Sequence, residues 1–160
     1  MRRIVFAAFA LTVSAACHPA TTDLTEAQRA EIVTAVSQVA TDNWRAWLAQ
    51  EDVDEVLSVS SDWAGTPWSG TSSLDQMRSD MALHWDRWDY DQDVEYNWDV
   101  MVLAPNVAAA KMTTDFVRTD VDGNVQNWTV NWATVWMLED GAWKLLLAKN
   151  DWIEKEPAGG

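Results

Sequence analysis

Hydrophobic residues recur at two different spacings along this chain, and the spacing changes near residue 92. Before that point they lie three and four residues apart, which predicts helices with one buried face. We expect a long helix from Asp23 to about Gln50, a short helix from Asp52, and a third from Ser73 that carries Trp88 on its apolar face. Each start has a Ser or Asp of the kind that caps a helix.

After residue 92 apolar and polar residues alternate, and turn-forming pairs with Gly or Pro interrupt the alternation, as in a series of hairpins. The predicted strands cover residues 94–102, 107–121, 125–138 and 142–153. Helices first and hairpins second predict an α+β domain, in which three N-terminal helices pack on one face of an antiparallel sheet. We expect one domain, because 160 residues with 48% hydrophobic content suit a single core.

A tryptophan stands at every fourth position of one predicted strand: Trp128, Trp132 and Trp136. Strand geometry puts these three rings on the same face of the sheet. If Asp122-Gly123 and Asp140-Gly141 are two-residue turns, counting outward gives the register, and this face meets the helices. The side chains predicted to bind a ligand between sheet and helices are Trp85, Trp88, Trp98, Lys111, Trp128, Trp132 and Trp136, with His84 on the third helix and Asp62 near the mouth of the pocket.

The same register places four charged residues on this apolar face: Lys111, Asp115, Lys149 and Asp151. Asp115 would lie beside Tyr96 among the tryptophans, and an apolar environment would raise the pKa of its carboxyl group. Asp151 would be the ionised counterpart, with Lys149 setting the balance between the two carboxylates, an arrangement suited to proton transfer. The structural alternative is that Lys149 forms an ion pair with Asp115 or Asp151, and that His84 is a core histidine with satisfied hydrogen bonds.

Residues 1–16 have the order of a secretory signal peptide: two arginines, an apolar run and small residues. The segment Ser14-Ala15-Ala16-Cys17 also resembles a bacterial lipoprotein signal, so two outcomes stay open, lipidation of Cys17 and plain cleavage after Ala16. Either outcome exports the protein, to the periplasm or, lipid-anchored, to the cell envelope of a bacterium. Residues 17–22 would then be a tether, residues 23–156 the domain and residues 157–160 a tail.

The chain is strongly acidic, with a formal net charge of −14 that becomes −16 if residues 1–16, with Arg2 and Arg3, are removed. Such a surface repels phosphate backbones and anionic lipids, which argues against nucleic-acid binding and against membrane contact other than through a lipid anchor. We expect no cofactor and no metal, because two histidines and one cysteine supply no zinc ligand set.

The order of the helices and the sequence of the last hairpin resemble those of a known family. Residues 132–145 read Trp-Ala-Thr-Val-Trp-Met-Leu-Glu-Asp-Gly-Ala-Trp-Lys-Leu. The order Asp-Gly, any residue, Trp, basic, aliphatic is similar to the last hairpin of the SnoaL-like bacterial branch of the nuclear transport factor 2-like superfamily. The resemblance covers residues 24–153. It implies a cone with a pocket between the concave sheet and the helices, as in ketosteroid isomerase, and often a homodimer through the outer sheet face.

This chain departs from the family pattern at one point that concerns chemistry. Many members carry two cavity-facing histidines soon after the last tryptophan, where this chain has Leu147 and Lys149. Three functions therefore stay open. The first is an exported pocket protein that binds a small hydrophobic or aromatic molecule in a tryptophan-lined cavity. The second is a small lyase, isomerase or hydrolase that uses Asp115, Asp151 and Tyr96 as acid/base groups. The third is a non-catalytic module that dimerises or binds partners through its sheet.

Overall fold

The structure is a computed structural model that describes residues 23–61, 73–91 and 93–155. Three helices come first, as the sequence predicts: α1 (Glu26–Leu48), α2 (Val53–Leu57) and α3 (Leu74–Trp85). Five strands follow: β1 (Trp88–Tyr90), β2 (Asp99–Ala104), β3 (Val107–Asp120), β4 (Val125–Glu139) and β5 (Ala142–Glu154). The predicted signal peptide, the tether with Cys17, Asp62 and the C-terminal tail lie outside the described residues.

The helix starts follow the capping side chains, with one correction. The N-cap of α1 is Thr25 and not Asp23, because Thr25 and Gln28 form a reciprocal capping box: each side chain accepts a hydrogen bond from the backbone N–H of the other residue. Asp52 and Ser73 are confirmed as the N-caps of α2 and α3.

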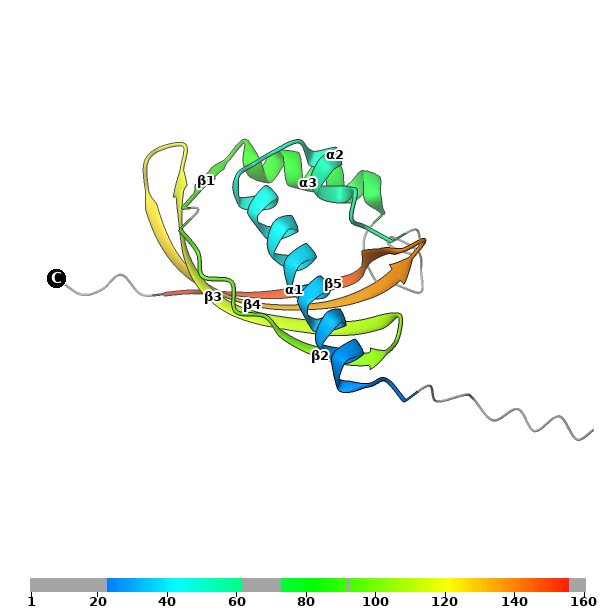
Figure 1. Cartoon of the computed structure of the whole chain (residues 1–160). Coiled ribbons are helices and arrows are strands. Elements are labelled where there is room, and N and C mark those ends of the chain that lie inside the picture. Colours follow the sequence, from blue (N-terminus) through cyan, green and yellow to red (C-terminus); the bar gives the residue numbers. More distant parts are fainter. Residues whose placement is uncertain (1–22, 62–72, 92, 156–160) are drawn as a thin grey trace, which may run out of the picture.

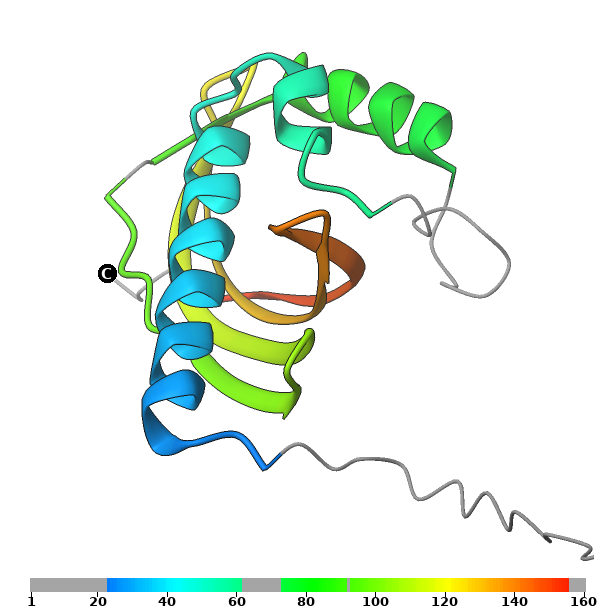
Figure 2. The ribbon, with the colours of Figure 1, turned by 45° about the vertical axis from the view of Figure 1, so that its right-hand side comes forward.

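The sheet is antiparallel and curved, and α1 crosses its concave face (Figures 1 and 2). The strand order is β1-β3-β4-β5, and β2 also pairs with β3. Strands β1 and β2 therefore share β3: β1 pairs with residues 118–120 and β2 with residues 107–111. Trp88 belongs to β1 and not to the third helix as predicted, since α3 ends at Trp85. The α+β prediction, helices on a curved antiparallel sheet, is confirmed.

The hairpin between β3 and β4 is one residue out of the predicted register. The loop has three residues, Val121 to Gly123: the Gly123 N–H donates to the Asp120 carbonyl at 2.9 Å, and Gly123 takes a φ of +85°. Such loops combine a turn with a left-handed residue, for which glycine is favoured. Phe116 thus pairs with Trp128, where two-residue counting pairs Val117 with it. A shift of one residue reverses every side chain of β3.

The hairpin between β4 and β5 starts as predicted. Asp140 and Gly141 have φ values of +50° and +83°, and Glu139 pairs with Ala142, as a two-residue turn requires. The register then shifts: Trp136 pairs with Leu145, but Val135 pairs with Leu147. Leu146 is the extra residue of a β-bulge, and beyond it the inward and outward positions of β5 are exchanged.

The core consists of two clusters between α1 and the concave face. The first contains Trp44, Leu48, Met112, Phe116 and Val130 with neighbouring aromatic residues. The second contains Val36, Ala40, Ala108, Ala110 and Trp136. Alanine at three facing positions of α1 and β3 lets the helix approach the sheet closely at the second cluster. Among the described helices, none combines the length and the apolar character needed to cross a membrane.

Candidate functional site

The charged residues predicted to form an acid/base site lie on the outer face of the sheet. Asp115, Lys149 and Asp151 are exposed, and so is Lys111, which forms an ion pair with Asp99 at 3.3 Å. The cause is register: the three-residue loop turns Lys111 and Asp115 outward, and the bulge at Leu146 turns Lys149 and Asp151 outward. The prediction that these four charges face the helices is wrong.

The pKa of Asp115 is also shifted in the direction opposite to the one expected. Its carboxylate forms an ion pair with Lys155 at 2.5 Å and accepts a hydrogen bond from the Thr129 hydroxyl at 2.6 Å. Hydrogen bonds from Lys155 and Thr129 lower the pKa of Asp115, whereas a site beside Tyr96 was expected to raise it. The partner of Asp115 is thus Lys155 and not Lys149. Tyr96 instead packs against the first core cluster, with the Arg45 guanidinium 4.9 Å from its ring centroid.

Replacing Asp115 with Asn should therefore leave the molecule almost unchanged. Exposed ion pairs contribute roughly 0–1 kcal/mol, so we expect the free energy of unfolding to fall by less than about 1 kcal/mol. Urea titration of D115N beside the matched variant Lys155→Gln measures this effect. A loss of several kcal/mol in D115N alone would contradict the outer-face assignment.

The predicted tryptophan face is confirmed for β4. Trp128, Trp132 and Trp136 all pack on the concave side. The sequence predicts that these rings meet Met77, Met81, Trp85 and Trp88 of the third helix, but α1 and not α3 runs over the middle of the sheet. Trp132 lies 4.5 Å from Trp44 of α1, measured between ring centroids, and the Trp98 indole donates to the Thr41 hydroxyl of α1 at 3.2 Å.

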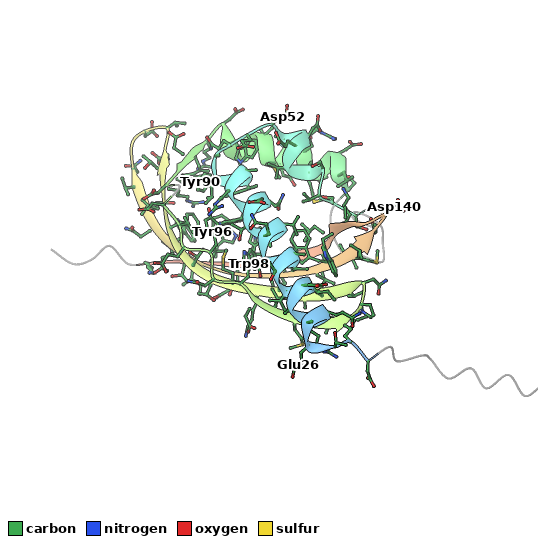
Figure 3. All side chains as sticks on the ribbon, in the orientation of Figure 1. Glu26, Asp52, Tyr90, Tyr96, Trp98 and Asp140 are labelled. Atoms are coloured by element: carbon green, nitrogen blue, oxygen red, sulfur yellow. The ribbon has the colours of Figure 1, made fainter. Side chains whose placement is uncertain are left out.

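Aromatic rings from six elements form a continuous group at the β1 end of the sheet, which we call the concave aromatic cluster. Trp44 and Trp47 of α1 stack with centroids 5.0 Å apart and planes inclined by 7°. Trp47 lies 6.1 Å from Trp152 of β5, which meets Phe116 of β3 at 5.1 Å. The other members are His84, Trp85, Trp88, Tyr90, Trp128 and Trp132. Figure 3 labels Tyr90 toward the β1 end and Trp98 nearer β2.

Three polar side chains lie together within this cluster: His84, Tyr90 and Arg118. The Tyr90 hydroxyl is hydrogen-bonded to His84 Nε2. Tyr90 and Arg118 are directly paired between β1 and β3, and Arg118 is paired in turn with Gln126 of β4. Burial raises the pKa of Tyr90, so its hydroxyl stays protonated at neutral pH. Burial, with the nearby Arg118 and Arg87, lowers the pKa of His84, so its ring is neutral.

Arg118 lies between aromatic rings. Its guanidinium carbon is 3.8 Å from the ring centroid of Trp88 and 4.4 Å from that of Trp128. Its Nε donates to Gln126 Oε1 at 2.9 Å, and the Trp128 indole donates to the same oxygen at 3.3 Å. Burial lowers the pKa of Arg118, which still remains charged near neutrality because an arginine titrates far above this range. No carboxylate of the described residues forms an ion pair with it.

Two indole N–H groups in the cluster are buried without a hydrogen-bond acceptor among the described residues, those of Trp44 and Trp85. A buried donor without an acceptor costs free energy of about 1–3 kcal/mol, and most such donors in folded proteins are satisfied. Trp44 is 3% exposed. By contrast, the buried Trp136 indole donates to the Thr134 hydroxyl at 2.8 Å. The cluster thus has hydrogen-bonding capacity that the described part of the chain leaves unused.

Sequence reasoning identified His84, Trp85, Trp88, Trp128 and Trp132 but missed the other half of the cluster. Counting from two-residue turns puts Phe116 and Arg118 on the outer face, because they alternate with Asp115, and puts Trp152 there because it follows Asp151. Trp44 was missed although it lies four residues after Ala40 on the apolar face of α1. Within the described ranges, no group of three His, Cys, Asp or Glu side chains is arranged to hold a metal ion.

The neutral state of His84 should make stability depend on pH. The unfolded chain takes up the His84 proton at its ordinary pKa near 6.5, whereas the folded chain does so only at lower pH. The contribution of neutral His84 to the free energy of unfolding is therefore fully present above pH 6.5, and it decreases as the pH falls toward the lowered pKa of His84. We expect the difference in unfolding free energy between wild type and His84→Gln to shrink from pH 7.5 to pH 5. A difference that grows on acidification would contradict a neutral, buried His84.

No family model and no curated protein matches the sequence. Solved structures are similar in fold. A type 2 hexachlorocyclohexane dehydrochlorinase (LinA) superimposes with a TM-score of 0.62 at 11% identity, covering 84% of this chain and 99% of that one. The type 3 enzyme from Novosphingobium barchaimii LL02 gives 0.63 at 12% identity, with coverages of 84% and 96%. A Xanthomonas campestris chain described as a calcium/calmodulin-dependent protein kinase II association domain gives 0.55 at 17%, with coverages of 71% and 82%.

These likenesses show the fold. In this chain, as in these solved structures, helices pack against a curved antiparallel half-barrel sheet. The predicted α+β cone is thus confirmed as a fold.

Proposed function

We propose that this protein is an exported binding protein of the SnoaL-like branch that holds a small aromatic molecule against the concave aromatic cluster. The observation that carries the proposal is the pair of buried, unpartnered indole N–H groups of Trp44 and Trp85. A bound molecule with a hydrogen-bond acceptor would satisfy such donors, while the surrounding rings would stack on its aromatic part. Two of the similar structures are dehydrochlorinases that act on a small molecule, hexachlorocyclohexane.

Binding is favoured over the acid/base alternative by the position of the carboxylates. Asp115 and Asp151 are exposed on the outer face, away from the concave aromatic cluster. A carboxylate acting as general base must come within hydrogen-bonding distance of the substrate proton that it removes. A substrate in the cluster would be on the other side of the sheet from both.

Benzamide is a suitable first probe, because it combines one aromatic ring with an uncharged acceptor. We expect millimolar benzamide to shift the ¹H–¹⁵N indole signals of Trp44 and Trp85, each assigned with a Trp→Phe variant. The matched control is the Trp136 signal, since that N–H already has an acceptor in the other core cluster. Unchanged signals for Trp44 and Trp85, or equal shifts of all twelve tryptophans, would refute this binding site.

A second copy of this chain is the partner that we propose for the outer face of the sheet. A groove of about 300 Å³ there is lined by apolar and charged residues, among them Asp99, Met101, Ala109, Lys111, Leu147 and Lys149. Met101 is 65% exposed. The groove carries both signs of charge, so two copies related by a twofold axis can set the lysines of one against the aspartate of the other.

Sedimentation velocity tests this interface. Wild type should sediment as a dimer at micromolar concentration, and Met101→Lys should shift the population to monomer. The exposed but distant Leu83→Lys serves as the control. A wild type that sediments only as monomer would exclude the interface.

Export is proposed from the N-terminal sequence pattern, with Cys17 as the residue that decides the mode of attachment. In a bacterial host, a lipid-anchored chain should fractionate with the envelope, and Cys17→Ser should release it or block its processing. A wild-type chain that is processed yet soluble in the periplasm would indicate plain cleavage after Ala16. Retention of the unprocessed chain in the cytoplasm would refute export.

A further inference from the structure

Arg118 is a cation on the face of the sheet where charges are least expected. It lies two residues after Phe116 on β3, and like Phe116 it is turned toward the concave side. Its guanidinium is held between Trp88 and Trp128 and fixed through Nε by Gln126. Partly buried charges are normally paired with an opposite charge. Here no such pair exists among the described residues, although the chain as a whole has 25 Asp and Glu.

The immediate surroundings of Arg118 favour a single negative charge. Glu154 is near enough to raise the pKa of Arg118 but forms no ion pair with it. The two other polar groups nearby, the Tyr90 hydroxyl and the His84 ring, are uncharged near neutral pH for the reasons given above. Arg87, whose guanidinium carbon lies 5.4 Å from the Trp88 ring centroid, adds a second positive charge, and Glu154 adds a negative one. The three charges sum to one positive charge, which matches a monoanion beside the two neutral hydrogen-bonding groups.

Aromatic rings flank this polar group on the sheet side. The ring centroid of Trp152 lies 6.2 Å from that of His84 and 6.0 Å from the Arg118 guanidinium carbon. The ring centroids of Phe116 and Tyr90 are 5.9 Å apart. A planar guanidinium binds a planar carboxylate through two parallel hydrogen bonds. Its Nε donates to Gln126 and its side chain also hydrogen-bonds with Tyr90, so the terminal N–H groups that do not face Tyr90 are the donors that remain for this purpose.

We propose that the ligand of this protein is a small aromatic carboxylate, whose carboxylate group pairs with Arg118 while its ring packs against Trp152 and Phe116. This inference rests on the proposed function, because it assigns the chemical class of the molecule bound by the concave aromatic cluster. Tyr90 and His84 then supply neutral hydrogen-bonding groups beside the carboxylate.

Benzoate and benzamide separate the two proposals, because they have the same shape and differ in charge. Calorimetry at pH 7 should show benzoate binding at least 10-fold more tightly than benzamide to the wild-type protein. Raising the salt concentration should weaken benzoate binding and leave benzamide binding nearly unchanged. Arg118→Gln should reduce the ratio of the benzoate affinity to the benzamide affinity from at least 10 to about 1.

Arg45→Gln is the matched control, since Arg45 also lies over an aromatic ring, that of Tyr96, but on the exposed side of α1. It should leave benzoate binding unchanged. Arg118→Lys keeps the charge without the planar donors and should give an intermediate affinity. If Arg118→Gln does not fold, the wild-type ratio of the two affinities and its salt dependence still decide.

The outcomes that overturn the inference differ from those that overturn the binding site. Equal affinities for benzoate and benzamide, with both shifting the Trp44 and Trp85 indole signals, would exclude carboxylate recognition and leave the aromatic site intact. The same exclusion follows if Arg118→Gln binds benzoate as tightly as wild type. Binding of neither probe would refute the site and this inference together.

Discussion

Replacing Trp136 with Ala is expected to lower the free energy of unfolding by about 3–5 kcal/mol, the range found when a buried large side chain is truncated. Trp136 is 1% exposed and packs in the second core cluster with Val36, Ala40 and Ala108. The alanine would leave a cavity that the backbones of β3 and β4 cannot close, since both strands are paired on either side. It would also remove the donor bonded to the Thr134 hydroxyl.

Urea titration measures this loss, provided that the unfolding free energy of variant and wild type has the same slope against urea concentration. Trp136→Phe should cost less, because it keeps an aromatic ring and loses mainly the indole hydrogen bond. Leu83→Ala, at an exposed position outside the proposed dimer interface, is the surface control and should change stability by no more than about 0.5 kcal/mol. A Trp136→Ala variant within 1 kcal/mol of wild type would show that the second cluster is not closely packed.

Enlarging Ala40 to Leu is expected to destabilise the fold by about 1–3 kcal/mol through overpacking. Ala40 is 2% exposed and faces Ala108 and Ala110 of β3, which are themselves buried. The larger side chain can be accommodated only if α1 moves away from the sheet. Ala and Leu have similar helix propensities, so the effect should come from tertiary packing.

Ala35→Leu provides the matched control, because it makes the same change in the same helix at an exposed position. Its free energy of unfolding should stay within about 0.5 kcal/mol of wild type. Equal losses in the two variants would indicate that the effect arises in the helix itself and not at its contact with β3.

Most elements of this fold were predictable because they depend on short-range patterns, but β1 was not predicted and the strand predicted over residues 94–102 begins only at Asp99. Capping residues fixed the starts of α2 and α3, and alternation fixed the long strands to within a few residues. The faces of the strands were less predictable, because they depend on turn geometry. Asp122-Gly123 reads equally well as a two-residue turn or as the end of a three-residue loop, and only the second turns Phe116 and Arg118 inward.

The candidate site was predicted in part for the same reason. The tryptophans of β4 were assigned to the correct face, since the Asp140-Gly141 turn has the expected geometry. The acid/base group was not, because its four charged residues lie on the segments displaced by the loop and by the bulge. Trp44 and Trp47 needed knowledge of which helix crosses the sheet, which follows from long-range packing and not from the local sequence.

The bulge at Leu146 makes the C-terminal strand sensitive to changes in its length. Leu145 and Trp152 are seven positions apart, an odd spacing, and yet both pack on the interior, because Leu146 has no partner on β4. Deleting Leu146 would remove the bulge and keep pairs such as Ala133–Lys149, so the faces beyond it would not change. A deletion between the bulge and Lys149 that left the bulge in place would instead bring Lys149 and Asp151 under the helices and expose Trp152 to water.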